Sequence, residues 1–154
     1  MAACGGRESA SLDAREHDCM ARAMYFESNR SSRDGMIAVG TVVMNRVDSP
    51  DFPGTVCGVV GQKRQFAPGV MSRKMQGRSV ALVREAAAAV LRGERHPRIV
   101  RARFFHAAGY RASYNNMHYV LTTGGNAFYE KRRPEFVTQP VPLEPLEGIT
   151  GRSL

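Results

Sequence analysis

The amino-acid sequence predicts a single α+β domain with a helical N-terminal half and a small antiparallel β element in the C-terminal half. Its 154 residues correspond to one domain, and 43% hydrophobic residues are enough for one core. The segments with a helical pattern all lie before residue 93, whereas the segments that resemble strands come after it.

The first predicted helix covers residues 12–27. Its apolar face is formed at helical spacing by Cys19, Met20, Ala23 and Met24. Ser11 or Asp13 is suited to cap its N-terminus. We expect residues 1–11 to form a flexible N-terminus.

The segment 31–48 has the clearest helical pattern of the chain. Its apolar positions are Met36, Ile37, Gly40, Val43, Met44 and Val47. Ser31 and Asp34 resemble a capping box, and the Asp-Ser-Pro sequence at 48–50 ends the helix. Because Gly40 lies on the apolar face, its missing side chain would let another element approach closely.

Two further helices and a long loop are predicted before residue 93. Thr55 is placed to cap a short helix that runs through Gly61. Residues 62–78 show no periodicity, and a loop of this length inside a compact domain is more often functional than idle. Ser79 is expected to cap an alanine-rich helix over residues 80–92.

The predicted strands lie in the C-terminal half. Residues 99–106 are rich in Val, Ile and Phe, and residues 126–130 predict a second short strand. Residues 110–123 fit neither pattern. Residues 132–154 form a proline-rich tail that we expect to be extended or to wrap around the surface.

The net charge of +8 favours an anionic partner such as nucleic acid, a membrane surface or an acidic polymer. Nineteen of the 22 basic residues are arginines, and they are spread along the chain. A solvated, arginine-rich surface explains this composition equally well. Nucleic acid is not the predicted partner, because the chain has no nucleic-acid motif and its arginines and aromatic residues are not interleaved in a compact patch.

The three cysteines, Cys4, Cys19 and Cys57, can form at most one disulfide. A bond between Cys19 and Cys57 is one option for an exported protein. His106 and His118 are 12 residues apart and have no carboxylate cluster nearby, so neither a metal nor another cofactor is expected.

Glu27 stands out because it is a carboxylate at the C-terminal end of an apolar helix face, four residues after Ala23. Desolvation and the negative end of the helix dipole would both raise its pKa there. A carboxylic acid that stays protonated near neutral pH can act as a general acid. On position alone, an exposed helix end or an ion pair is the stronger interpretation, with candidate partners Arg22, Arg30 and Arg46.

Several motifs follow one another at compatible spacing. They are Ala-Arg-Ala-Met-Tyr-Phe-Glu-Ser at 21–28, Gly-Met-Ile-Ala-Val-Gly-Thr-Val-Val-Met-Asn-Arg-Val at 35–47, Phe-Pro-Gly-Thr-Val-Cys-Gly-Val-Val at 52–60, Gln-Phe at 65–66, Arg-Phe-Phe-His at 103–106 and Gly-Gly-Asn-Ala-Phe-Tyr at 124–129. This succession, over residues 19–130, resembles the cell wall hydrolase family typified by the spore cortex-lytic enzyme SleB. The sequence departs from the family at Asn126, where a His is frequent, and at His106, where an Asn is frequent.

The resemblance implies a lysozyme-like fold and a peptidoglycan glycosidase domain over residues 12–131, with Glu27 as the catalytic general acid/base. The implied reaction is cleavage of the glycan strand between N-acetylmuramic acid and N-acetylglucosamine. Hydrolysis by two carboxylates needs a second acid about 5–9.5 Å from the first. The nearest candidates in the sequence, none of which matches a family motif, are Asp34, Asp48 and Asp51.

A lytic transglycosylase needs only one carboxyl group, so this mechanism is preferred. A hydrolytic muramidase, including a bacteriolytic phage endolysin, is the alternative. Gln65 and Phe66 match the family in the long loop and are predicted to bind substrate. Phe105, His106 and Tyr119 are further substrate-binding candidates, although core packing is the stronger interpretation for Phe105.

Glycan strands of peptidoglycan are the expected partner, an anionic envelope surface is the second, and we expect a monomer. The chain shows no apolar run near the roughly 20 residues that span a membrane, and its first ten residues do not resemble a signal peptide. We expect the protein to act at the cell wall or in the periplasm. It would then be a phage lysin, a chain that has lost its leader, or a protein that a secretion machine delivers. A non-catalytic peptidoglycan-binding module and a nucleic-acid-binding module are the alternatives.

Overall fold

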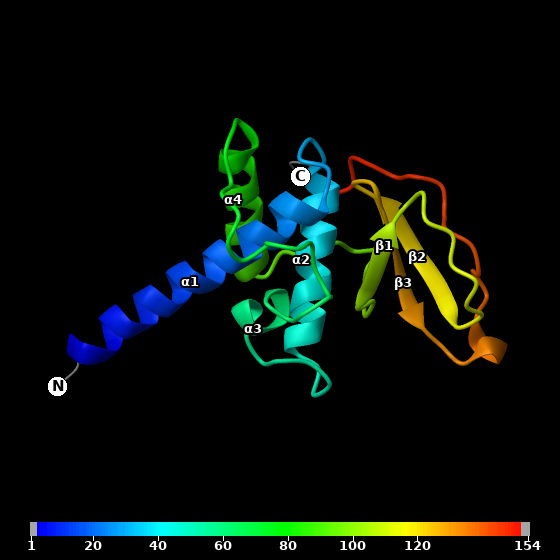
Figure 1. Ribbon diagram of the computed structural model, residues 1–154, viewed down its shortest axis with the longest axis horizontal. Helices are drawn as coiled ribbons and strands as arrows, with labels where there is room; N and C mark the ends of the chain where they lie inside the picture. Colours follow the sequence, from blue (N-terminus) through cyan, green and yellow to red (C-terminus); the bar gives the residue numbers. More distant parts are fainter. Residues whose placement is uncertain (1–2, 152–154) are drawn as a thin grey trace.

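A computed structural model describes the backbone of residues 3–151 and the side chains of residues 13–151. Its elements are the helices α1 (Ala3–Glu27), α2 (Arg33–Val47), α3 (Val56–Val60) and α4 (Ser79–Leu91), the strands β1 (Phe104–Ala107), β2 (Met117–Thr123) and β3 (Asn126–Lys131), and a 3₁₀ turn at Pro134–Phe136. The helices lie together on one side and the sheet lies on the other (Figure 1). The predicted α+β architecture is therefore confirmed.

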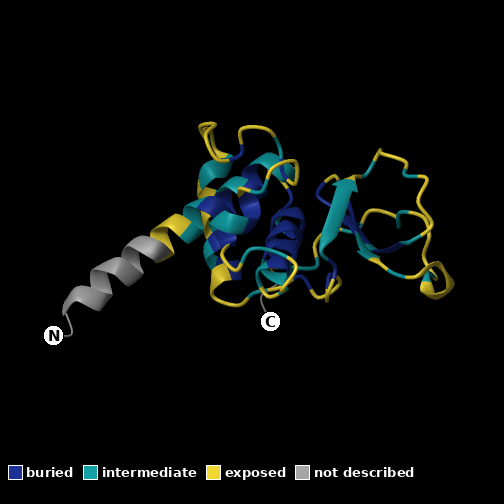
Figure 2. Cartoon of the chain, turned by 60° about the horizontal axis from the view of Figure 1, so that its bottom comes forward, coloured by how far each residue is buried: buried dark blue, intermediate teal, exposed yellow. Residues whose placement is uncertain are grey.

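Helix α2 lies between the other helices and the sheet (Figure 1), and nearly all of its residues from Asp34 to Val43 are buried (Figure 2). Gly40 is the point where α1 and α4 approach α2 closely. A Cβ atom at this position would lie 2.7 Å from Met24 Cε of α1 and 2.9 Å from Val90 Cγ2 of α4. The prediction that Gly40 admits a close neighbour is confirmed, because two helices meet α2 there.

Three predicted helix starts need correction. Helix α1 begins at Ala3 and not at residue 12, so described residues 3–11 are helical where we expected a flexible N-terminus; this stretch has no proline to interrupt the helix. Residues 1–2 lie outside the described part. Helix α2 is capped by Ser32, whose hydroxyl accepts the Gly35 N–H at 2.9 Å, and not by Ser31. Helix α4 begins at Ser79, so this residue does not act as its cap.

The three antiparallel strands have the spatial order β1-β3-β2. Phe105 of β1 lies opposite Phe128 of β3. Strand β1 is shorter than predicted, because Ile99 and Ala102 form hydrogen-bonded turns and bury their side chains in the helical core. Before residue 104, the apolar residues that suggested a strand are therefore buried but do not form one. The ambiguous segment 110–123 contains strand β2.

The turn between β2 and β3 lies against the start of α2. Gly124 has a φ of +58°, and a Cβ atom built on it would lie 2.5 Å from the Gly35 Cα atom. The Gly124 carbonyl accepts a hydrogen bond of 2.9 Å from the Asn29 N–H, just after the end of α1. These contacts bring the first residues of β3 beside the C-terminus of α1.

The C-terminal tail wraps over the sheet, which is one of the two expected arrangements, and returns to the start of α2 (Figure 1). The Leu146 N–H donates to the Thr122 carbonyl at 2.9 Å. Asp34 accepts backbone hydrogen bonds from Ile149 at 2.9 Å and Thr150 at 2.8 Å. The carboxylate of Glu147 accepts from the Ser32 hydroxyl at 2.6 Å and from the Gly124 N–H at 2.8 Å.

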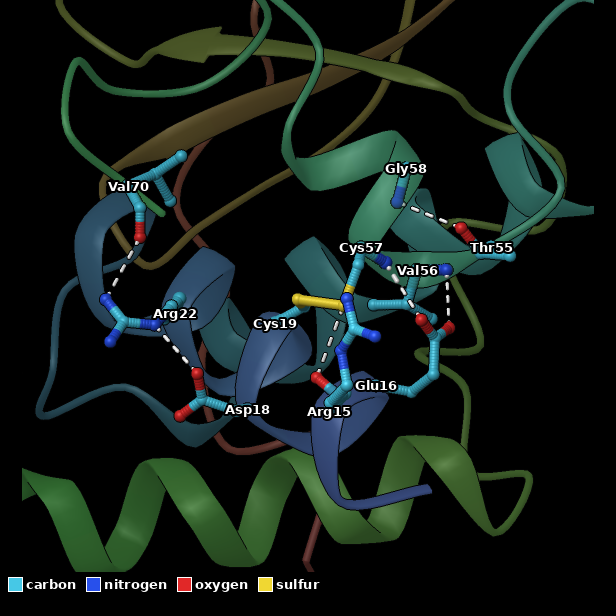
Figure 3. The surroundings of a disulfide bond; sticks show 10 residues. All are labelled: Arg15, Glu16, Asp18, Cys19, Arg22, Thr55, Val56, Cys57, Gly58 and Val70. Atoms are coloured by element: carbon cyan, nitrogen blue, oxygen red, sulfur yellow. Dashed lines mark hydrogen bonds and ion pairs between the residues drawn. A yellow bond between two sulfur atoms is a disulfide. The ribbon is translucent and has the colours of Figure 1, made fainter. Parts of the chain in front are cut away.

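A disulfide joins Cys19 of α1 to Cys57 of α3 (Figure 3). Beside it, the Glu16 carboxylate accepts the N–H groups of Val56 at 2.6 Å and Cys57 at 3.2 Å, which satisfies donors at the start of the short helix. Thr55 caps the same helix as predicted, by accepting the Gly58 N–H at 3.0 Å. No helix in the described part of the chain is long and apolar enough to cross a membrane.

Candidate active site

Glu27 is the last residue of α1, and its side chain is half-buried between the two halves of the molecule. One carboxylate oxygen accepts a hydrogen bond from the Ala67 N–H of the long loop. Its backbone carbonyl accepts from Asn126 Nδ2 of β3 at 2.8 Å. Glu27 is therefore held by a loop on one side and by the sheet on the other.

The loop that carries Ala67 is fixed to α1. Arg22 donates to the Val70 carbonyl at 3.3 Å and to the Arg73 carbonyl at 2.5 Å, and one of these contacts is visible in Figure 3. The Tyr25 hydroxyl donates to the Gln76 carbonyl at 2.8 Å. Although the loop lacks helix and strand, its backbone is positioned well enough to present one N–H group to Glu27.

Burial raises the pKa of Glu27, and this effect outweighs two opposing influences, the hydrogen bond from Ala67 and the positive charge of Arg46. The sequence-based expectation of a raised pKa is confirmed through desolvation. A side chain of this kind retains its proton to higher pH than an exposed glutamate, which a general acid requires.

The ion-pair interpretation of Glu27 is wrong for all three arginines considered. Arg22 binds Asp18 at 2.8 Å. Arg30 donates to the Tyr25 carbonyl at 3.1 Å and its guanidinium lies 3.7 Å from the centroid of that ring. Arg46 acts on Glu27 through its charge, and no ion pair within 4.0 Å joins Glu27 to a basic group among residues 13–151.

Arg46 is a buried cation whose side chain is surrounded by aromatic rings. Its guanidinium carbon lies between 5.1 and 5.7 Å from the ring centroids of Phe52, Phe66 and Phe104. The Nε atom donates to the Arg103 carbonyl at 2.8 Å, while Nη1 has no partner in the described part of the chain. Burial lowers the pKa of Arg46 to about 10, and its charge remains in place at neutral pH. The sequence could not indicate these aromatic surroundings of Arg46, because they come from distant segments.

The predicted substrate residues of the loop have different environments. Phe66 is 9% exposed and packs against Phe105, with ring centroids 6.2 Å apart. Phe105 in turn packs on Phe128 at 5.3 Å. Gln65 is exposed two residues before Ala67. Gln65 and Phe66 directly precede Ala67, whose N–H binds Glu27, while Phe105 packs against the core, which was its stronger interpretation.

His106 and Tyr119 form a separate cluster on the sheet. His106 Nε2 and the Tyr119 hydroxyl are 2.7 Å apart. Both rings contact Tyr129, whose centroid is also 5.6 Å from that of Phe104. A row of aromatic rings therefore runs from this cluster to the surroundings of Arg46. Tyr129, a half-buried ring that links the two, was not singled out by the sequence.

None of the three acidic residues considered as a second carboxylate contacts Glu27. Asp34 is occupied by the C-terminal tail. Asp51 is exposed and lies 3.6 Å from Arg103, and Asp48 lines a surface cavity. No carboxylate contributes to the raised pKa of Glu27. Within the described residues, no hydrogen bond joins Glu27 to a second carboxyl group.

A buried helix with its helical neighbours, a small antiparallel sheet and a half-buried glutamate between them define a lysozyme-like α+β domain. Two solved structures share this fold. The catalytic domain of the Bacillus cereus SleB protein matches with a TM-score of 0.61 and 25% identity over 75% of this chain and 89% of that chain. The catalytic domain of a germination-specific lytic transglycosylase, SleB from Bacillus anthracis, matches with a TM-score of 0.60 and 25% identity over 75% and 93%.

The chain belongs to the cell wall hydrolase family, whose model matches residues 30–129. Glu27 lies just before the matched segment. Two curated relatives are spore cortex-lytic enzymes: one from Bacillus cereus is 47% identical over 47 residues, and one from Bacillus subtilis is 36% identical over 47 residues. These matches cover 30% of this chain, but only 18% and 15% of the two enzymes, so the similar region spans less than a fifth of their length.

Proposed function

We propose that this chain cleaves the glycan strand of peptidoglycan between N-acetylmuramic acid and N-acetylglucosamine, and that Glu27 is the general acid and base. The observation that carries the proposal is a half-buried glutamate with a raised pKa and no ion-pair partner among the described residues. Membership of the cell wall hydrolase family supports peptidoglycan as the substrate. We assign this activity to residues 12–131, with residues 132–154 as a tail that stabilises the domain.

The preferred mechanism is that of a lytic transglycosylase. Protonated Glu27 gives its proton to the glycosidic oxygen as the bond from this oxygen to the muramic acid C1 breaks. The resulting carboxylate removes the proton from the 6-hydroxyl of the same muramic acid, and O6 bonds to C1 to close a 1,6-anhydro ring. The Ala67 N–H and the charge of Arg46 both favour the carboxylate form, so they stabilise Glu27 between the two steps.

Two further observations favour transglycosylation over hydrolysis. Hydrolysis by an inverting or retaining pathway uses a second carboxylate near the first, and no carboxylate of the described residues is among the groups that shift the pKa of Glu27. The similar Bacillus anthracis domain is itself described as a lytic transglycosylase. The hydrolytic muramidase is the second candidate, with water in place of the 6-hydroxyl.

We further propose that the chain acts as a monomer at the cell wall or in the periplasm. The disulfide between Cys19 and Cys57 supports an oxidising compartment. The net charge of +8 supports attraction to an anionic envelope.

The test compares wild type, Glu27→Gln and Asp48→Asn on purified peptidoglycan, with turbidity to follow cleavage and mass spectrometry to identify products. We expect Glu27→Gln to lose cleavage by about a hundredfold or more with an unchanged circular dichroism spectrum. Asp48→Asn should remain active, and the products should end in 1,6-anhydromuramic acid. A fully active Glu27→Gln variant would refute the role of Glu27. Reducing-end muramic acid without the anhydro sugar would replace transglycosylation by hydrolysis.

A further inference from the structure

A cavity of about 600 Å³ lies between the C-terminal end of α2 and the strands β1 and β3. Basic side chains outnumber acidic ones in its lining, which includes Arg101, Arg103, Lys131 and Arg132 with Asp48 and Glu130. We call this surface the basic cavity. The proposed cleavage at Glu27 does not use any of these charges.

Two of the four basic residues already have acidic partners. Arg132 binds Glu130, with a shortest separation of 2.8 Å. Arg103 lies 3.6 Å from Asp51. These pairs keep part of the lining in place and leave little charge for a ligand.

Arg101 and Lys131 are different, because neither has a carboxylate partner among residues 13–151. Both side chains are exposed. The Lys131 ammonium lies 4.3 Å from the centroid of the Phe104 ring, which also lines the cavity. The basic cavity therefore presents two unneutralised cations, one of them against an aromatic face.

The basic cavity is connected to the surroundings of Glu27 through Arg46. The Phe104 ring centroid is 5.7 Å from the Arg46 guanidinium carbon. The charge of Arg46 in turn influences the pKa of Glu27. Phe104 and Arg46 therefore link the lining of the basic cavity to the environment of Glu27.

We propose that the basic cavity binds carboxylate groups of the stem peptide attached to muramic acid while the glycan strand is held at Glu27. This inference rests on the proposed function. In a stem-bearing strand the lactyl group of muramic acid is joined to the peptide as an amide, so the carboxylates that remain belong to the peptide. Arg101 and Lys131 supply the complementary charge.

The test measures binding and cleavage separately. Binding is measured by calorimetry with the Glu27→Gln variant, and initial cleavage rates at low substrate concentration are measured with an intact Glu27. Both use soluble glycan strands with tetrapeptide stems, the same strands after an amidase has removed the stems, and stem-bearing strands whose carboxylates have been converted to amides. The double variant Arg101→Gln/Lys131→Gln is compared with Arg15→Gln/Arg92→Gln, which removes two exposed charges outside the basic cavity.

We expect the unmodified cavity to bind stem-bearing strands about fivefold more tightly than stripped or amidated strands, as two partly exposed ion pairs would provide. The cavity variant should lose this preference, and the control variant should keep it. Equal binding of the three strands by the unmodified cavity overturns the inference, as does a preference that survives in the cavity variant. An equal loss of affinity for all three strands would also overturn it, because the cavity would then contact the glycan itself.

Failure of the proposed function gives a different result. If the Glu27→Gln variant still cleaves the strands, Glu27 is not the catalytic acid, whereas the difference in binding between stem-bearing and amidated strands still reports on the basic cavity.

Discussion

The contact between Gly124 and Gly35 provides a quantitative test of how the sheet is attached to the helices. Gly124 has a φ of +58°, and a Cβ atom there would lie 2.5 Å from a backbone carbon of α2. Gly125 has a φ of +82°, but a Cβ atom there meets nothing within 4 Å. The two adjacent glycines thus share the backbone conformation and differ in the space beside them.

We expect Gly125→Ala to lower the free energy of unfolding by about 1–2 kcal/mol, the cost of a left-handed conformation for an alanine. Gly124→Ala should cost about 2–5 kcal/mol, because overpacking adds about 1–3 kcal/mol when the neighbouring atom is backbone and cannot rotate away. Urea unfolding at an unchanged m-value measures both.

The Gly124→Ala variant should also lose activity at temperatures where it remains folded. The turn that contains Gly124 leads directly into Asn126, which holds the backbone carbonyl of Glu27 at 2.8 Å. The reasoning is refuted if the two alanine variants unfold with the same free energy, since the close approach of the turn to α2 would then have no energetic consequence.

Three further predictions concern charge and cross-linking. Burial would raise the pKa of Asp34, but hydrogen bonds from the tail hold this pKa below its usual value. The contribution of Asp34 to the free energy of unfolding should therefore be present above about pH 4 and be lost on acidification. Unfolding measured across this pH range should show a smaller loss of stability for Asp34→Asn than for the wild type, and equal losses contradict the role. Arg46→Met removes a charge that lowers the pKa of Glu27, so the alkaline limb of the kcat/KM profile should move to higher pH, and an unmoved limb contradicts the coupling. Replacing Cys19 and Cys57 by Ala opens a loop with a sequence separation of 38 and should lower the free energy of unfolding in denaturant by about 4 kcal/mol. Reduction of the wild type should have the same effect, and no change on reduction would argue against the bond.

Much of the helical half was predictable from local patterns. The apolar periodicity of residues 36–47 identified α2, and Thr55 identified the start of α3 because a capping hydroxyl acts on an N–H only three residues away. The same kind of signal placed the α2 cap at Ser31, one residue too early. Either serine suits the pattern, and the choice depends on Asn29 and Glu147, which bind the two hydroxyls.

The prediction of a strand over residues 99–106 was mostly wrong, because hydrophobic residues indicate burial more directly than they indicate backbone conformation. Ile99 and Ala102 are fully buried, but they pack on the helices from a turn. The tail wraps around the surface, which is one of the two arrangements that we expected. Its attachment to Asp34 could not be predicted, because the two segments are 115 residues or more apart.

The sequence by itself determined the helices, the order of the family motifs and Glu27 as the carboxylate at the end of an apolar helix face. Only the tertiary structure decided that this carboxylate is without an ion pair in the described residues, has a raised pKa and is held from two sides. The physical reason is that desolvation and hydrogen bonding depend on groups from distant segments. Ala67 lies 40 residues from Glu27 and Asn126 lies 99 residues away, and folding alone brings them together.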